Sequence, residues 1–239
     1  MLLKDGVKNG KHVLIAEGLE NAGEDLVETF AGRGATVAFL YHAKAHQSLE
    51  LVRRSGSLNI KCNLRNEESL NLSTDVVKEF FQSQLDVFVC NVCFESEGSG
   101  YCGAAASEED DSSTKQEINN VWSQARAILQ MNENKISAII ERILPMMNRG
   151  ASIILLMPSE IQLSTTIANK ECVRMALHVL QHSLEGLIEA ASDMLKEKDI
   201  RINGIYADNP DASGKDIASV AQFLASGSAA SLTGQIIQL

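Results

Sequence analysis

Two cysteines stand at the spacing of a metal or redox pair. Cys90 and Cys93 form a Cys-x-x-Cys unit at the end of the apolar run 85–90. Such a unit can bind zinc or form a redox-active disulfide, but structural zinc sites usually need a second pair. The remaining cysteines are scattered: Cys62, Cys102 and Cys172. We therefore expect small side chains buried at a strand end and no metal site.

A histidine pair is the second candidate. His178 and His182 lie four residues apart in a segment with helical periodicity, and Glu185 follows one turn later. Side chains at this spacing share one helix face and can bind a metal. Because no further ligand accompanies them, we expect the histidines to face solvent or a subunit contact.

Composition limits the partners of the chain. Its 239 residues carry a formal charge of −10, with a pI near 5.0 and 45% hydrophobic residues. One domain of this length is common, and the acidic balance argues against nucleic acid and anionic membranes as partners. The start of the chain has no secretory signal pattern, and five scattered cysteines favour reduced thiols. We therefore expect a cytoplasmic protein.

Short apolar runs alternate with longer segments of helical periodicity. The expected strands are 12–16, 35–41, 58–62, 85–90, 152–157, 200–205 and 234–239. The expected helices are 21–32, 43–54, 67–84, 117–148, 169–198 and 216–226. This alternation predicts an α/β, Rossmann-like, doubly wound domain, with a seven-stranded, mainly parallel sheet and helices on both faces. The acidic, Gly/Ser-rich segment 95–115 is expected to be a surface loop.

Three features resemble the short-chain dehydrogenase/reductase family. Residues 199–205 (Asp-Ile-Arg-Ile-Asn-Gly-Ile) are similar to its sixth strand, and 221–235 to its C-terminal "FLaS…TGq" signature. Asn132, thirteen residues before Pro145, stands where the family keeps an active-site asparagine. The resemblance covers nearly the whole chain and implies a single Rossmann domain over 1–239 that binds NAD(P).

The glycine-rich turn of that family is altered here. The family motif T-G-x-x-x-G-x-G aligns with 16–23, where Glu17 and Asn21 replace the first two glycines and Gly23 keeps the third. Glycines there allow a tight turn and a close approach to the pyrophosphate. Gly18 partly restores the turn, but the acid Glu17 would repel a diphosphate. The resemblance therefore implies a dinucleotide site that is weakened or lost.

Other matched positions favour NADP over NAD. The second strand ends without the acid that would bind the NAD ribose, whereas His42 and Lys44 could meet a 2′-phosphate. Asn63 stands at the place of the family's adenine contact. Asn91 keeps an asparagine of the family's N-N-A-G motif, while Cys93 replaces its glycine.

The family's catalytic residues are a serine followed by Tyr-x-x-x-Lys, and the tyrosine is missing. Ser159 matches the serine. One register places Thr166 at the tyrosine and keeps the lysine as Lys170, whereas counting back from strand 200–205 places Leu177 and Gln181 there. Neither register supplies a phenol, and a threonine hydroxyl is a much weaker acid.

Three hypotheses follow. The first is a catalytically impaired binding or assembly subunit in a homo- or hetero-oligomer with subunits of the same fold. The second is an NADP-dependent carbonyl oxidoreductase that uses Ser159, Lys170 and Asn132, with water as the proton source. The third is a lyase similar to halohydrin dehalogenases, which carry an anion pocket on this scaffold.

Overall fold

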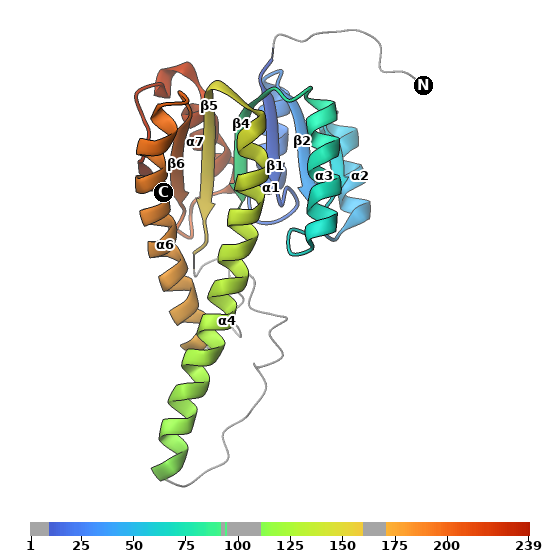
Figure 1. The fold of residues 1–239 in the computed structure, drawn as a ribbon. Helices are drawn as coiled ribbons and strands as arrows, with labels where there is room; N and C mark the ends of the chain where they lie inside the picture. Colours follow the sequence, from blue (N-terminus) through green and yellow to red (C-terminus); the bar gives the residue numbers. More distant parts are fainter. Residues whose placement is uncertain (1–9, 92–93, 95–110, 160–170) are drawn as a thin grey trace.

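The computed structural model describes residues 10–91, 94, 111–159 and 171–239 as a parallel sheet flanked by helices (Figure 1). The strands are β1 (His12–Ala16), β2 (Thr36–Tyr41), β3 (Leu58–Lys61), β4 (Leu85–Asn91), β5 (Met147–Met157), β6 (Arg201–Tyr206) and β7 (Ile236–Gln238). The helices are α1 (Gly23–Gly32), α2 (Ala45–Ser55), α3 (Glu67–Phe80), α4 (Asp111–Ile143), α6 (Glu171–Lys196) and α7 (Gly214–Ala225), with 3₁₀ turns at Leu144–Met146 and Gly227–Ala229.

The sheet has the order β3-β2-β1-β4-β5-β6-β7, and each pairing between these strands is parallel. The predicted α/β class and number of strands are therefore confirmed, and "mainly parallel" becomes fully parallel for the described strands. The strand order reverses direction between β1 and β4. In open parallel sheets, ligands bind at the carboxyl edge beside such a reversal.

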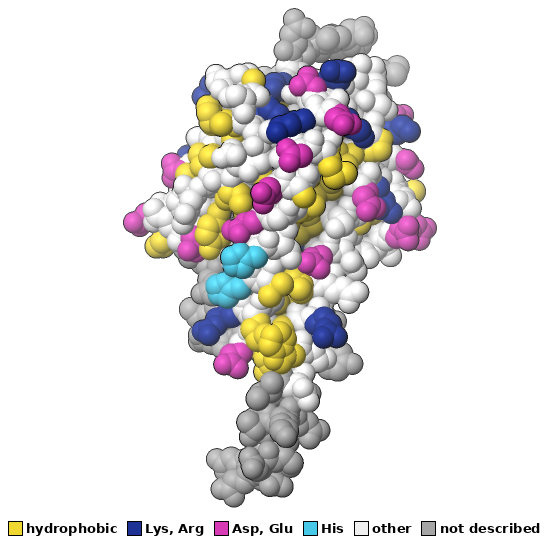
Figure 2. All heavy atoms as spheres, turned by 60° about the vertical axis from the view of Figure 1, so that its left-hand side comes forward, with side chains coloured by type: hydrophobic (Ala, Val, Ile, Leu, Met, Phe, Trp, Pro, Cys, Tyr) yellow, Lys and Arg dark blue, Asp and Glu magenta, His cyan; other side chains and the backbone are white. Residues whose placement is uncertain are grey.

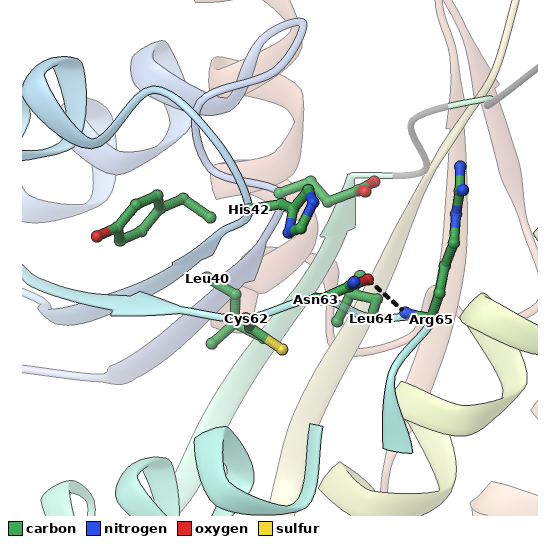
Figure 3. A pocket seen from close by; sticks show the side chains of 8 residues that line it. Leu40, His42, Cys62, Asn63, Leu64 and Arg65 are labelled. Atoms are coloured by element: carbon green, nitrogen blue, oxygen red, sulfur yellow. Dashed lines mark hydrogen bonds between the residues drawn. The ribbon is translucent and has the colours of Figure 1, made fainter. Parts of the chain in front are cut away.

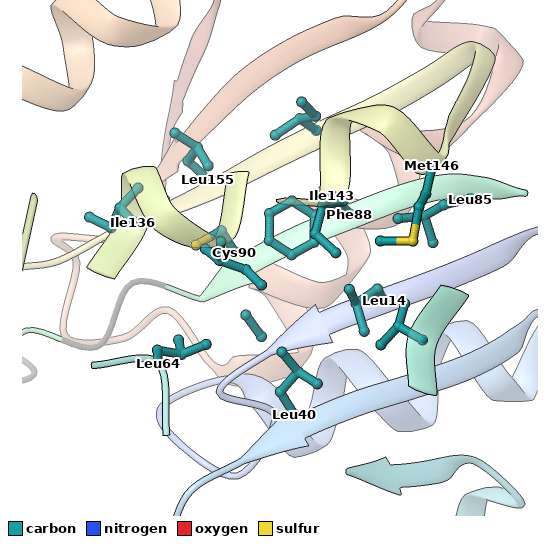
Figure 4. Packing of buried hydrophobic residues seen from close by; sticks show 14 of the residues in the cluster. Leu14, Leu40, Leu64, Leu85, Phe88, Cys90, Ile136, Ile143, Met146 and Leu155 are labelled. Atoms are coloured by element: carbon teal, nitrogen blue, oxygen red, sulfur yellow. The ribbon is translucent and has the colours of Figure 1, made fainter. Parts of the chain in front are cut away.

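Alternating side chains divide the core into two layers. Leu14 points to the face covered by α3, α4 and α6, where it packs with Leu40, Phe88 and Leu155, and Ile136 of α4 belongs to the same cluster (Figure 4). The opposite face is covered by α1, α2 and α7. Burial of both faces explains why the central strands read as continuous apolar runs.

The boundary between α4 and β5 differs from the prediction. We expected a helix over 117–148, but α4 ends at Ile143 and the chain passes through a 3₁₀ turn containing Pro145. β5 then begins at Met147, five residues before the expected start, because Met147 pairs with Leu85 before a register shift. At its other end, α4 begins at Asp111, within the segment expected to be a loop. Residues 95–110 lie outside the described residues.

Helices α4 and α6 extend together past the end of the sheet (Figure 1). Ala125 and Ile128 of α4 pack against Cys172, Val173 and Ala176 of α6 in a separate small cluster. No helix in the described part of the chain combines the length and the apolar character needed to cross a membrane.

Candidate active site at the carboxyl edge of the sheet

A cavity of about 100 Å³ lies at the carboxyl ends of β1, β2 and β3 (Figure 3). Its lining residues are Glu17, Leu40, Tyr41, His42, Cys62, Asn63, Leu64 and Arg65. A larger hollow of about 390 Å³ borders it between α3 and α4, and the two share Leu64 and Arg65. This edge therefore brings together two of the predicted site residues, His42 and Asn63, with Glu17 of the altered glycine turn.

The turn after β1 keeps the backbone conformation of a glycine-rich turn, although other residues replace its first two glycines. Glu17 has a φ of +54° and Asn21 a φ of +47°, both in the left-handed region. Asparagine tolerates this conformation, whereas a glutamate there costs about 1 kcal/mol or more. The Gly18 N–H donates to the carbonyl of Leu40 at 2.9 Å, which ties the turn to β2. The sequence alignment of this turn is thus consistent with its observed geometry.

Gly23 lets α1 approach the turn closely. A Cβ on Gly23 would lie 2.6 Å from the carbonyl carbon of Gly18 and 2.7 Å from its oxygen. Exposed Gly186 in α6 has no atom within 4 Å of such a Cβ.

We expect Gly23→Ala to lower the free energy of unfolding by about 1 to 3 kcal/mol through overpacking. Gly186→Ala should raise it by about 0.5 to 1 kcal/mol through helix propensity. Urea denaturation measures both, and changes of the same sign would contradict this reading of Gly23.

Asn91 holds the same turn from β4. Its side-chain amide donates to the carbonyls of Glu17, at 3.1 Å, and Glu20, at 2.6 Å. The residue is 1% exposed. The amide therefore fixes the turn by satisfying two carbonyl groups, in addition to any contact it makes with a ligand.

A largely buried ion pair crosses the mouth of this turn. Lys135 Nζ of α4 lies 3.1 Å from Oε1 and 3.3 Å from Oε2 of Glu17. The lysine side chain is 3% exposed and the glutamate side chain 15%. Buried charges are rare unless paired. The sequence analysis did not predict a role for Lys135. A signal was present, because Lys135 lies on the helix face that also includes Ile128 and Asn132, and a lysine on a buried face indicates a carboxylate partner.

Cys90 lies close to this pair and is chemically inert at neutral pH. Burial, and to a smaller extent the charge of Glu17, raise the pKa of its thiol to about 12, while the charge of Lys135 opposes the rise. Burial also raises the pKa of Cys62. The expected buried side chain at this strand end is confirmed for Cys90, while Cys93 lies outside the described residues. Among the residues that the structure describes, no group of three or more His, Cys, Asp or Glu side chains could hold a metal.

Two of the predicted cofactor residues, Lys44 and Asn63, already make contacts within the chain. Lys44 Nζ lies 2.8 Å from Glu20 Oε2 and 3.4 Å from the carbonyl of Leu19. Asn63 Oδ1 accepts the backbone N–H of Arg65 at 3.0 Å, which closes the turn after β3 (Figure 3). His42 lines the cavity.

The predicted catalytic residues are described only in part. Asn132 is buried in α4, and its amide donates to the carbonyl of Ile128 at 2.8 Å. Ser159 is fully buried just after β5. Thr166 and Lys170 lie outside the described residues. The first register therefore stays a prediction.

The second register places an amide next to Ser159. Gln181 of α6 donates to the carbonyl of Pro158 at 2.8 Å and lies 3.4 Å from the hydroxyl of Tyr206, which ends β6. Leu177, one turn earlier, is buried. The only phenol that the described residues bring to Gln181 thus comes from β6. No local pattern indicates this contact, because 25 residues separate Gln181 from Tyr206.

The histidine pair lies on the exposed face of α6, as expected. His178 and His182 are both exposed, and His182 Nδ1 lies 2.9 Å from Glu185 Oε2. Figure 2 shows histidine side chains on the surface of the face that α6 presents, next to hydrophobic side chains.

Comparison with known proteins agrees with the fold just described. The model of the family described as enoyl-(acyl carrier protein) reductase, a short-chain dehydrogenase/reductase group, matches residues 20–213. No curated protein matches the sequence.

Solved structures share the fold at low sequence identity. A short-chain dehydrogenase/reductase from Serratia marcescens is 19% identical, with a TM-score of 0.72 and 97% of each chain covered. An NADH-dependent enoyl-[acyl-carrier-protein] reductase from Aquifex aeolicus is 20% identical, with a TM-score of 0.73 and coverage of 97% of this chain and 96% of the other. BdcA from E. coli, solved in complex with NADPH, is 17% identical, with a TM-score of 0.68 and coverage of 98% and 94%.

Proposed function

Because this chain belongs to the short-chain dehydrogenase/reductase family, we propose that it is a divergent member that has lost reductase chemistry and acts as an assembly subunit. It pairs through α4 and α6 with a second subunit of the same fold, either another copy or a relative. The observation that supports this proposal is the side chain of Gln181. One register assigns the position of Gln181 to the catalytic lysine, and the amide found there donates to the carbonyl of Pro158.

The chemical reason is the absence of a positive charge at Gln181. Reductases of this fold need a proton donor whose pKa is tuned toward neutrality, and a nearby cation is the usual means. A phenol has an ordinary pKa near 10, and a neutral amide such as Gln181 supplies no charge that would lower the pKa of a phenol beside it. This arrangement supports a scaffold whose proton relay no longer works.

The assembly role rests on apolar side chains that α4 and α6 leave exposed. Trp122 of α4 is 59% exposed, and Val179 and Leu187 of α6 are 46% and 38% exposed. Figure 2 shows hydrophobic side chains along the face formed by the long helices. Two helices from each of two subunits can bury such faces as a four-helix contact about a two-fold axis.

Sedimentation analysis tests the pairing. We expect the wild-type chain to sediment as a dimer or larger, and Val179→Glu/Leu187→Glu to sediment as a monomer, because burying two carboxylates at an apolar contact is costly. Leu72→Glu in α3, where Leu72 is 62% exposed, is the matched control and should leave assembly unchanged. A double variant that assembles like wild type would refute the α4/α6 contact.

A second candidate is an NADP-dependent carbonyl oxidoreductase with an atypical proton relay. The observation in its favour is the Tyr206 hydroxyl, which lies 3.4 Å from Gln181 at the edge where Ser159 follows β5. Under this candidate the phenol of β6 replaces the missing one on α6. Turnover with NADPH distinguishes it from the first proposal.

A further inference from the structure

We propose that Glu17, held by Lys135, excludes dinucleotides from the cleft, so that the chain carries its own anion where the family binds a diphosphate. This inference concerns nucleotide binding and goes beyond the loss of turnover proposed above. The residues at the turn do not fit the dinucleotide that membership of the family implies.

The carboxylate of Glu17 belongs to the turn against which a diphosphate would bind. In this fold the pyrophosphate lies against the turn between β1 and α1, on the N-terminal end of the helix. Glu17 belongs to that turn, lines the cavity and is 15% exposed in its side chain. A negative charge in such a partly desolvated place repels another anion more strongly than an exposed one does.

Two lysines and an arginine near the turn are matched with carboxylates. Lys135 pairs with Glu17, and Lys44 pairs with Glu20. Arg54 contacts Glu24 at 2.6 Å. The first turn of α1 adds Asp25 to Glu24 as a second acid. In the described part of the chain no side chain caps this helix, but the acids of its first turn, together with Glu17, place negative charge where a diphosphate would bind, so the turn does not fit a diphosphate.

The geometry also keeps the carboxylate in place. The backbone of Glu17 is fixed in the left-handed region, and its carbonyl accepts a hydrogen bond from Asn91. Its carboxylate contacts Lys135 through both oxygens. Moving the carboxylate out of the cleft would break this buried pair, so the exclusion is built into the fold.

Calorimetric titration with NADPH and with NADH tests the inference, with Glu17→Gln, Glu17→Gly and wild type compared. We expect no saturable binding to wild type at millimolar dinucleotide and at least about tenfold tighter binding to both variants, because removing a like charge near a bound anion has this effect. Glu28→Gln is the matched control. Glu28 lies in the same helix, pairs with Arg54 and does not line the cavity.

Folding and function are separated from binding in the same experiment. Glu17→Gln keeps the size of the side chain, and Glu17→Gln/Lys135→Met removes both charges if the single variant fails to fold, as judged by circular dichroism. Tighter binding to these variants without NADPH consumption supports both proposals. Saturable binding to wild type that Glu17→Gln leaves unchanged, or no gain in any folded variant, would overturn the exclusion, whatever the result of the sedimentation test.

Discussion

Lys135→Met is expected to lower the free energy of unfolding by about 3 to 5 kcal/mol, which is typical of removing one partner of a buried ion pair. The side chain of Lys135 is 3% exposed, so solvent screens the pair only weakly. Its loss leaves the Glu17 carboxylate in the cavity mouth without the ammonium that now faces it. Urea denaturation followed by circular dichroism measures the change.

The double variant Glu17→Gln/Lys135→Met should recover most of that loss, because replacing both charges removes the desolvation penalty together with the attraction. Lys196→Met is the control for an exposed ion pair. Lys196 and Asp193 are 61% and 78% exposed in their side chains, and such pairs contribute at most about 1 kcal/mol. Losses that simply add in the double variant would show that Glu17 and Lys135 are not energetically coupled.

Asn203→Ala is expected to lower the free energy of unfolding by about 2 to 4 kcal/mol, because it removes two hydrogen bonds that join β6 to the segment just before β7. The Asn203 amide donates to the carbonyl of Leu232 at 3.0 Å, and its Oδ1 accepts the N–H of Gln235 at 3.0 Å. The side chain is fully buried in β6. Each backbone group left unsatisfied costs about 1 to 3 kcal/mol. The same urea titration measures the effect.

Asn203→Asp tests the direction of these bonds. The aspartate can still accept from Gln235, but it places a carboxylate oxygen against the Leu232 carbonyl, so we expect it to be at least as destabilising as alanine near pH 7. Asn209→Ala is the control, because Asn209 is exposed and its side chain accepts only a local bond from the N–H of Asp211 among the described contacts. If Asn203→Ala cost no more than Asn209→Ala, the bridging role of Asn203 would be wrong.

The order of elements could be predicted because local pattern and tertiary position agree along most of the chain. The apolar run at 152–157 is buried on both faces, as its composition indicates. The boundary of α4 and β5 was wrong for a tertiary reason. Met147 and Asn148 have little strand character themselves, and pairing between Met147 and Leu85 extends β5 toward Pro145.

Part of the site could also be predicted from the sequence. The alignment located Glu17, Asn21 and Gly23 in the turn, and their backbone angles and close contacts fit that alignment. The helical pattern around Lys135 indicates a buried carboxylate partner, but it does not identify Glu17 as that partner, because 118 residues separate the two. Nor does local pattern identify the contact between Gln181 and Tyr206, which depends on how α6 packs against β6.

Consumption of NADPH by the wild-type chain, followed by its absorbance with a panel of aldehydes and ketones, is the most direct measurement of the lost chemistry. We expect no consumption above the rate without protein. Sustained, carbonyl-dependent consumption would contradict a subunit without reductase chemistry and favour the relay through Tyr206.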